Sequence, residues 1–211
     1  LCMTGDYASD MSDAAGTLWL DVAQRDWSQP LLTVCGLTAA HMPTLHEGPE
    51  ITGVLRSEVA TAWGMAAVPV VAGASDNAAG AIGCGVVEDG EASLSLGTSG
   101  VLFVANAAFR PNPAGGVHAF CHALPGRWHQ MAVILSASSC IDWAVRLLGL
   151  PDAAALFALV EGAGGSGDDA GGGELFLPYL SGERTPHNDP DACSVLFGLN
   201  HDSGPARIAA A

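Results

Sequence analysis

Residues 92–135 contain four β-rich runs in close succession, and no other part of the sequence constrains the fold as strongly. The first two runs lie on either side of Gly97-Thr98-Ser99-Gly100 in ASLSLGTSGVLFVAN, which is the pattern of a β-hairpin. The runs GVHAFCHAL and RWHQMAVIL follow, and each predicts a further strand. This half of the chain is therefore expected to contain four strands joined by short connections.

Two helices are expected directly after these strands. The segment SASSCIDWAVRLLGL places Ile141, Val145 and Leu148 on one helical face, and Gly149 supplies a common stop signal. Residues 151–160 predict a second helix.

Weaker signals lie outside this region. Ser12 or Asp13 is a candidate cap for a short helix, and residues 58–63 predict another helix. VPVV (68–71) predicts a short buried strand, and the Gly- and Ser-rich residues 161–173 predict a flexible loop. DSGP (202–205) resembles a helix start, but only six residues follow it. Because so short a helix is rarely stable alone, we expect the sequence to be a piece of a longer protein.

The charge of the chain excludes two classes of partner. It carries 22 acidic and 7 basic residues, a formal net charge of -15, and every basic residue is arginine. Such a chain repels nucleic acid phosphates and anionic lipid. It has no apolar run of membrane-spanning length and no signal peptide, so we expect a cytoplasmic protein with no nucleic acid or membrane partner.

The six cysteines are spread widely and include no CxxC pair, so we expect reduced and mostly buried thiols. A metal site is conceivable at His118, Cys121 and His122, with His129 nearby. In an alternating strand, however, residues 118 and 122 share one face while residue 121 points to the other. The sequence therefore predicts no metal site in this chain.

The stretch GASDNAAGAIG (73–83) places Asp76 and Asn77 after an apolar run and before small residues only. Ser75 or Asp76 is a natural helix cap. A carboxylate at a helix N-terminus is also stabilised in its ionised form, which suits a group that accepts a proton from a substrate hydroxyl. Ala78, Ala79 and Gly80 leave room for a ligand or another backbone to approach. The cap and the catalytic base remain open alternatives at this point.

The turn Gly97-Thr98-Ser99-Gly100 is a candidate anion site. A Walker A loop is excluded because that motif requires a lysine, and the chain has none. A tight turn between two strands can nevertheless aim backbone N–H groups and two hydroxyls at a phosphate, which glycine allows to approach closely. An ordinary structural turn is the alternative.

Several motifs in the same order resemble the FGGY carbohydrate kinase family. They include TGDYASDMSDAAGTLWLDVAQRDWS, GASDNAAGAIGCGVVEDGEASLSLGTSGVLFVAN, FRPNPAGGVHAFCHALPGRWHQMAVILSASSCIDW and LFLPYLSGERTPHNDPDA. The resemblance covers essentially the whole chain. It implies an α/β, actin-like and ribonuclease-H-like fold with two domains that close on a cleft, of which this chain is a central part. Residues 1–65 would end the sugar-binding domain, and residues 66–211 would contain its last part and the opening half of the ATP-binding domain.

The resemblance also implies roles for single residues. Asp76 matches the catalytic base and Asn77 a position beside the sugar, while Gly97 and Thr98 lie in a phosphate loop that Ser99 and Gly100 continue. Ser138 and Asp142 match positions that line the nucleotide site.

The implied activity is ATP- and Mg²⁺-dependent phosphorylation of D-xylulose to D-xylulose 5-phosphate, with a possible homodimer. A kinase of another sugar or polyol and a non-catalytic actin-like binding module are the alternatives. Because the family's reaction needs both lobes, we expect residues 1–211 alone to be inactive, with the metal ligands outside this chain.

Overall fold

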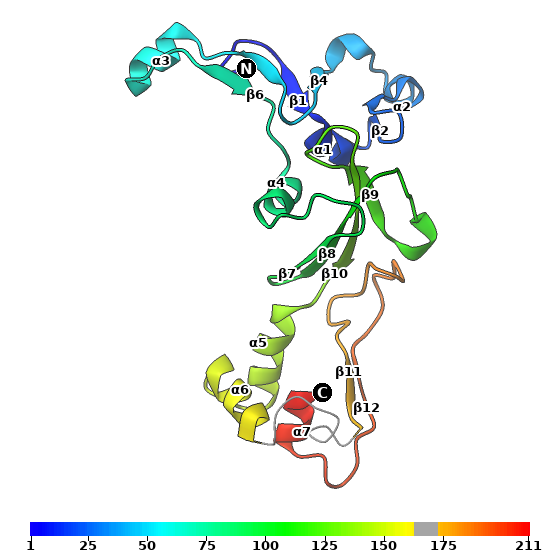
Figure 1. The fold of residues 1–211 in the computed structure, drawn as a ribbon. Helices are drawn as coiled ribbons and strands as arrows, with labels where there is room; N and C mark the ends of the chain where they lie inside the picture. Colours follow the sequence, from blue (N-terminus) through cyan, green and yellow to red (C-terminus); the bar gives the residue numbers. More distant parts are fainter. Residues whose placement is uncertain (163–172) are drawn as a thin grey trace. The chain divides into compact units, whose positions relative to one another are not determined.

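The computed structural model of the protein describes residues 1–162 and 173–211 (Figure 1). In chain order its elements are β1 (Ala8–Asp10), α1 (Met11–Ala14), η1 (Ala15–Thr17), β2 (Leu20–Asp21), β3 (Asp26–Trp27), α2 (Gln29–Val34), η2 (Ala39–His41), β4 (Thr44–His46), β5 (Ile51–Val54), α3 (Ser57–Trp63), β6 (Pro69–Val71), α4 (Asp76–Gly83), β7 (Ala92–Leu96), β8 (Gly100–Asn106), η3 (Pro113–Gly115), β9 (His118–Cys121), β10 (Trp128–Ile134), α5 (Ser138–Leu147), α6 (Ala153–Gly162), β11 (Leu175–Leu177), β12 (Val195–Phe197) and α7 (Pro205–Ala210).

The chain forms two compact units. The first contains residues 1–93, 103–113 and 117–131, and the second contains residues 94–102, 114–116 and 132–211. The division passes within β7, β8 and β10, so each of these strands contributes residues to both units.

The four strands predicted over residues 92–135 are confirmed. They form one sheet in the order β7-β8-β10-β9. β7 and β8 are neighbours joined by residues 97–99, as the hairpin prediction requires. β9 and β10 pair antiparallel, with His118 opposite Met131 and Cys121 opposite Trp128.

The first unit is held together by a cluster of small buried residues with aromatic rings around it. Ala14, Ala15, Leu20 and Cys121 form its centre, and the half-buried partners are Met11, Val22, Trp27, Leu45, Phe120 and Trp128. The indole of Trp128 donates to the Val22 carbonyl at 2.8 Å, and that of Trp27 donates to the Pro43 carbonyl at 2.9 Å. Each half-buried indole therefore keeps its hydrogen bond.

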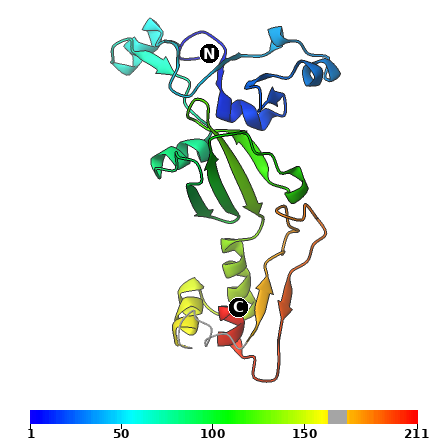
Figure 2. The same ribbon diagram turned by 45° about the vertical axis from the view of Figure 1, so that its right-hand side comes forward.

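The second unit packs helices against one face of a two-stranded ribbon. β11 and β12 pair antiparallel, and Figure 2 shows them beside α5 and α7. The rings of Trp143 and Phe176 stack at 5.1 Å, which ties α5 to β11. Leu175 and Phe197, on the opposite face of the ribbon, are exposed.

The predicted helices near residues 58–63, 138–148 and 151–160 are confirmed as α3, α5 and α6. Gly149 follows α5 with a φ of 66°, a left-handed conformation that suits glycine. The Gly-rich loop predicted at 161–173 lies mostly outside the described residues.

Three local predictions were wrong. α1 is capped by Asp10, whose carboxylate accepts from the backbone N–H groups of Ser12 and Asp13. β6 is largely exposed, because in the described part of the chain it forms a two-stranded ribbon with β5. The cysteines are free but not mostly buried, since Cys2, Cys35, Cys84 and Cys193 are exposed.

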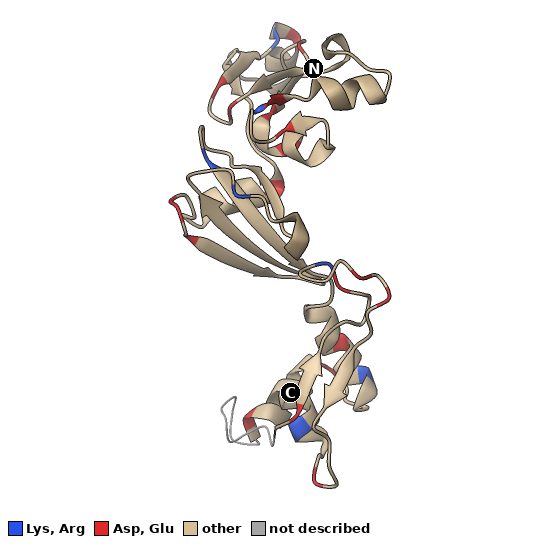
Figure 3. Cartoon of the chain, turned by 90° about the vertical axis from the view of Figure 1, so that its right-hand side faces the viewer, with Lys and Arg blue, Asp and Glu red and all other residues tan. Residues whose placement is uncertain are grey.

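Figure 3 shows the acidic excess as red positions scattered along the chain, with few blue ones between them. Within the described residues, no helix combines the length and the apolar character that a membrane crossing requires.

Candidate functional site

Asp76 is the first residue of α4, in the first unit. Its side chain is exposed, and its carboxylate accepts the backbone N–H of Asn77 at 2.7 Å and the Asn77 side-chain amide at 3.2 Å. Ser75 is the N-cap residue by backbone position, but its side chain makes no capping hydrogen bond. Asp76 thus satisfies one of the free N–H groups at the helix start while remaining accessible to solvent.

The segment that leads into α4 is fixed by residues far away in the sequence. The Ser75 N–H donates to the Ser12 hydroxyl at 2.9 Å, and that hydroxyl donates to the Asp10 carboxylate. Ser12 and Asp10 are 4% and 7% exposed, so this relay is buried. It fixes the backbone one residue before Asp76.

A second anchor lies two residues earlier. The Gly73 N–H donates to the Gly48 carbonyl at 3.0 Å. A Cβ at Gly48 would collide with the carbonyl oxygens of Ala123 and Gly73, so only glycine permits this close packing. The entry to α4 is therefore held on both sides.

One face of α4 is open. Ala79 and Gly80 are exposed, and a Cβ at Gly80 or Gly83 would meet nothing within 4 Å. Ala78 was expected to leave room for a ligand or another backbone; it is 0% exposed and faces the core, so a ligand cannot reach it. The accessible face runs from Asp76 through Gly80 at helical spacing.

The loop Gly97-Thr98-Ser99-Gly100 lies in the second unit and is bound to the start of α5. The N–H groups of Ala137 and Ser138 donate to the carbonyls of Thr98 and Gly97, both at 2.9 Å. α5 has no side-chain cap, so these carbonyls occupy N–H groups that a helix start leaves free. Gly97 and Thr98 remain exposed at the tip.

The other predicted residues of this loop are less accessible. The Ser99 hydroxyl donates to the Leu135 carbonyl at 3.0 Å, and Gly100 is buried. Ser138 is half-buried at the first turn of α5, and Asp142 is exposed one turn later on the same face. The second unit thus bonds Gly97 to Ser138 and Thr98 to the residues on either side of Ser138, with Asp142 one turn further along the helix.

The histidines considered for a metal site are packed in the core of the first unit. The His129 ring stacks on Phe103 with centroids 4.1 Å apart, and His122 Nε2 lies 3.2 Å from the Val86 carbonyl. Burial lowers the pKa of His122, and it lowers the pKa of His129 to about 3. Across the described residues, no three His, Cys, Asp or Glu side chains are close enough to share a metal ion.

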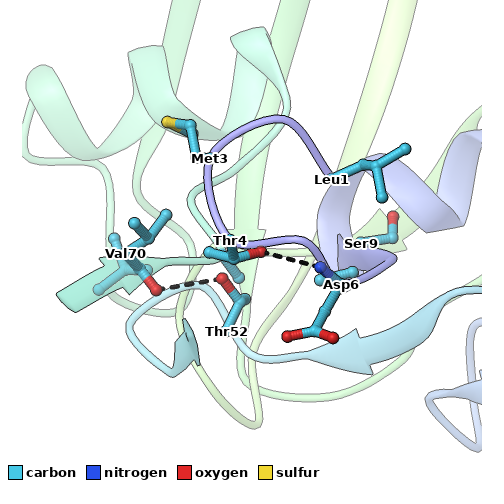
Figure 4. Close-up of a pocket in the computed structure, with 10 residues that line it drawn as sticks. Leu1, Met3, Thr4, Asp6, Ser9, Thr52 and Val70 are labelled. Carbon is cyan, nitrogen blue, oxygen red and sulfur yellow. Dashed lines mark hydrogen bonds between the residues drawn. The ribbon is translucent and has the colours of Figure 1, made fainter. Parts of the chain in front are cut away.

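A pocket of about 130 Å³ lies in the first unit, between residues 1–9 and strands β5 and β6 (Figure 4). Its hydroxyls are engaged within the protein: Thr4 Oγ1 accepts from the Asp6 N–H, and Thr52 donates to the Val70 carbonyl. Ligand pockets usually enclose roughly 300–1,000 Å³. None of the predicted site residues lines this pocket, and it is too small to be the main substrate site.

Sequence reasoning missed Asp10 and Ser12 as anchors of α4, and it assigned no role to the buried Glu183 in GERTP. Only Ser12 gave a local signal, as a possible helix cap.

Profiles of the FGGY family of carbohydrate kinases match the chain in two parts. The N-terminal domain profile matches residues 1–83, and the C-terminal domain profile matches residues 92–211. The chain is 59% identical over 211 residues to the xylulose kinase of Escherichia coli (strain K12) and 56% identical to that of Klebsiella pneumoniae. Both matches cover 100% of this chain but only 43% of the relative.

A solved structure shares the same fold. The crystal structure of a xyloylose kinase from Brucella ovis superposes with a TM-score of 0.91 at 49% identity, covering 99% of this chain and 42% of the other. The α/β fold is therefore that of the actin-like, ribonuclease-H-like FGGY kinases.

Proposed function

The chain belongs to the FGGY family of carbohydrate kinases, and from this premise we propose that it is part of an ATP-dependent kinase that converts D-xylulose into D-xylulose 5-phosphate. The observation that carries the proposal is the 59% identity, over every residue of the chain, to a xylulose kinase. The chain spans less than half the length of that relative, so the activity is proposed for a protein that contains this segment.

Asp76 is proposed as the general base. Its exposed carboxylate would take the proton from the sugar hydroxyl while the hydroxyl oxygen attacks the γ-phosphorus of ATP. A new O–P bond forms, the bond between the γ-phosphorus and the bridging oxygen breaks, and ADP leaves. Asn77 would orient the sugar, because its side-chain amide both donates and accepts hydrogen bonds.

The loop 97–100 is proposed to contact the phosphates of ATP. A Cβ at Gly97 would meet only the Ser99 carbonyl oxygen, at an ordinary contact distance of 3.8 Å, and Gly97 is exposed, so a phosphate oxygen can approach its backbone. The neighbouring Thr98 is also exposed at the tip. Ser138 and Asp142 would line the nucleotide site from α5. These residues would act by holding ATP in place, because most of the catalysis in phosphoryl transfer comes from orientation of the substrates and neutralisation of charge.

Mg²⁺ is expected to accompany ATP. The described residues offer no cluster of three ligating side chains, so they do not by themselves fit a dedicated metal site. No step above depends on a metal ligand from this chain.

The proposal also includes a sugar as the small-molecule partner, a cytoplasmic location, where ATP is supplied, and a possible homodimer. Residues 1–211 alone are expected to be inactive, because positioning two substrates against each other contributes roughly 7 to 11 kcal/mol.

The test is an ADP-release assay on a chimeric kinase, in which these 211 residues replace the aligned segment of the Escherichia coli relative. Turnover should be highest with D-xylulose among a panel that includes gluconate and glycerol. A preference for another member of the panel would favour the alternative of a different sugar or polyol kinase. A folded chimera that binds ATP without sugar-dependent turnover would favour a non-catalytic module.

A further inference from the structure

Glu183 is a buried acidic residue to which the proposed reaction gives no part. It is 2% exposed, and it lies in the GERTP segment that follows β11 in the second unit. A buried carboxyl group is costly unless hydrogen bonds satisfy it. Its partners therefore indicate what it does.

The carboxyl group binds the backbone at the end of β10. Glu183 Oε1 accepts the Leu135 N–H at 3.1 Å and the Arg184 N–H at 2.8 Å. Leu135 is the first residue after β10, where the chain turns toward α5, so its N–H lies beyond the last residue of the strand.

The carbonyl of the same residue is bound by the proposed phosphate loop. The Ser99 hydroxyl donates to Leu135 at 3.0 Å. Both backbone polar groups of Leu135 are thus satisfied by side chains, one from GERTP and one from the loop. Two residues further on, the Ala137 N–H binds the Thr98 carbonyl at 2.9 Å.

Glu183 is itself held rigidly. Its N–H and carbonyl exchange hydrogen bonds with Asp189 at 2.9 and 2.8 Å. The preceding Gly182 has a φ of 75°, and a Cβ there would lie 2.7 Å from the Pro190 carbonyl oxygen, so this turn requires glycine. Burial and then the charge of Glu183 raise the pKa of the Cys140 thiol, which lies close by on α5.

We infer that Glu183 is a positioning residue for the nucleotide loop, acting through Leu135 on Ser99 and Thr98. This inference rests on the proposed function, because it takes ATP as the ligand of the loop. Removing the carboxyl would leave the Leu135 N–H without its acceptor, and the turn that holds the loop would shift.

Thr185 offers a matched control. Its hydroxyl accepts the Val133 N–H at 3.1 Å and donates to the Gly116 carbonyl at 3.0 Å. It docks the same segment on the same strand (orange beside β10 in Figure 1) but makes no contact with Leu135 through these bonds. Thr185→Val therefore tests whether docking alone accounts for any effect.

The experiment measures binding of a non-hydrolysable ATP analogue and the melting temperature of the chimeric kinase. Glu183→Ala should weaken binding by about tenfold, as expected for one buried hydrogen bond with a charged acceptor. Glu183→Gln keeps an acceptor oxygen and should restore most of the affinity. Thr185→Val should lower the melting temperature and leave the analogue affinity within about twofold, since it affects docking only.

A double-mutant cycle with Ser99→Ala makes the test specific. If both side chains act through Leu135, the double variant should bind the analogue about as well as the weaker single variant. Additive losses, or a Glu183→Ala variant with unchanged analogue affinity, would overturn the inference. A parent chimera that does not bind the analogue at all would instead contradict the proposed function.

Discussion

The start of α4 and the loop 97–100 are held in place by different kinds of contact. The backbone before Asp76 is bound by the Ser12 side chain, 63 residues earlier in the chain. The carbonyls of Gly97 and Thr98 are bound mainly by backbone N–H groups of α5. One side-chain hydroxyl and the more distant backbone bond from Gly73 to Gly48 therefore support the proposed base, whereas several bonds to the same carbonyls support the proposed phosphate loop.

The largest effect is expected at the proposed base itself. In the chimeric kinase, Asp76→Asn should lower kcat by about 100-fold or more and leave ATP affinity nearly unchanged, because loss of a general base costs two to four decades in rate. Steady-state kinetics with varied ATP checks this. If Asp76→Asn turns over within a few-fold of the parent, Asp76 acts only as a helix cap and not as the general base.

Thr98→Val probes the loop without changing its shape. The substitution keeps the β-branch and removes one hydroxyl, so it should weaken ATP binding or slow transfer by roughly 1 to 3 kcal/mol. KM for ATP and kcat are the measurements. Unaltered kinetics with a changed melting temperature would identify an ordinary structural turn.

Two serine substitutions test whether the loop 97–100 is held by more hydrogen bonds than the start of α4. Ser12→Ala removes the side-chain bond that the Ser75 N–H makes among the described residues, and it should lower kcat about five- to tenfold. Ser139→Ala removes a hydroxyl bond to the Thr98 carbonyl, but two N–H groups still bind that carbonyl. It should change kcat and the KM for ATP less than about twofold. Equal effects of the two substitutions would contradict the comparison.

The last prediction concerns the buried His129, which should affect the stability of the fold and leave activity nearly unchanged. The pKa of His129 is about 3 in the folded protein and near 6.5 when unfolded, so the unfolded state binds more protons between these values. Stability should therefore fall as the pH drops below 6.5, by about 2 kcal/mol at pH 5.

Melting temperatures between pH 7 and pH 5 check this dependence. His129→Phe keeps an aromatic ring against Phe103 and should reduce the slope of the pH profile, while the contribution of His122, whose pKa burial also lowers, remains. A parent-like slope in His129→Phe would show that another group is responsible.

Local patterns predicted the strands of residues 92–135 and helices α3, α5 and α6, because each is long enough to show its own periodicity. β1, β4, β11 and β12 were missed, since three residues carry too little alternation. β6 is equally short and was found only because VPVV is a continuous apolar run. The bonds Ser75–Ser12 and Leu135–Glu183 join residues 63 and 48 positions apart, so no local pattern could reveal them. Local patterns singled out Asp76 and the loop 97–100 as candidates. The family resemblance supplied their roles and added Ser138 and Asp142, and these roles remain predictions.

The most direct test follows the phosphorus atom. The chimeric kinase is incubated with MgATP and D-xylulose, and ³¹P NMR monitors the γ-phosphoryl group. We predict a phosphomonoester signal assigned to D-xylulose 5-phosphate, with ADP formed in equal amount, and no such signal over the same time for Asp76→Asn. A folded chimera that binds ATP but produces no phosphorylated xylulose, or an Asp76→Asn variant that produces it at the parent's rate, would contradict the proposal.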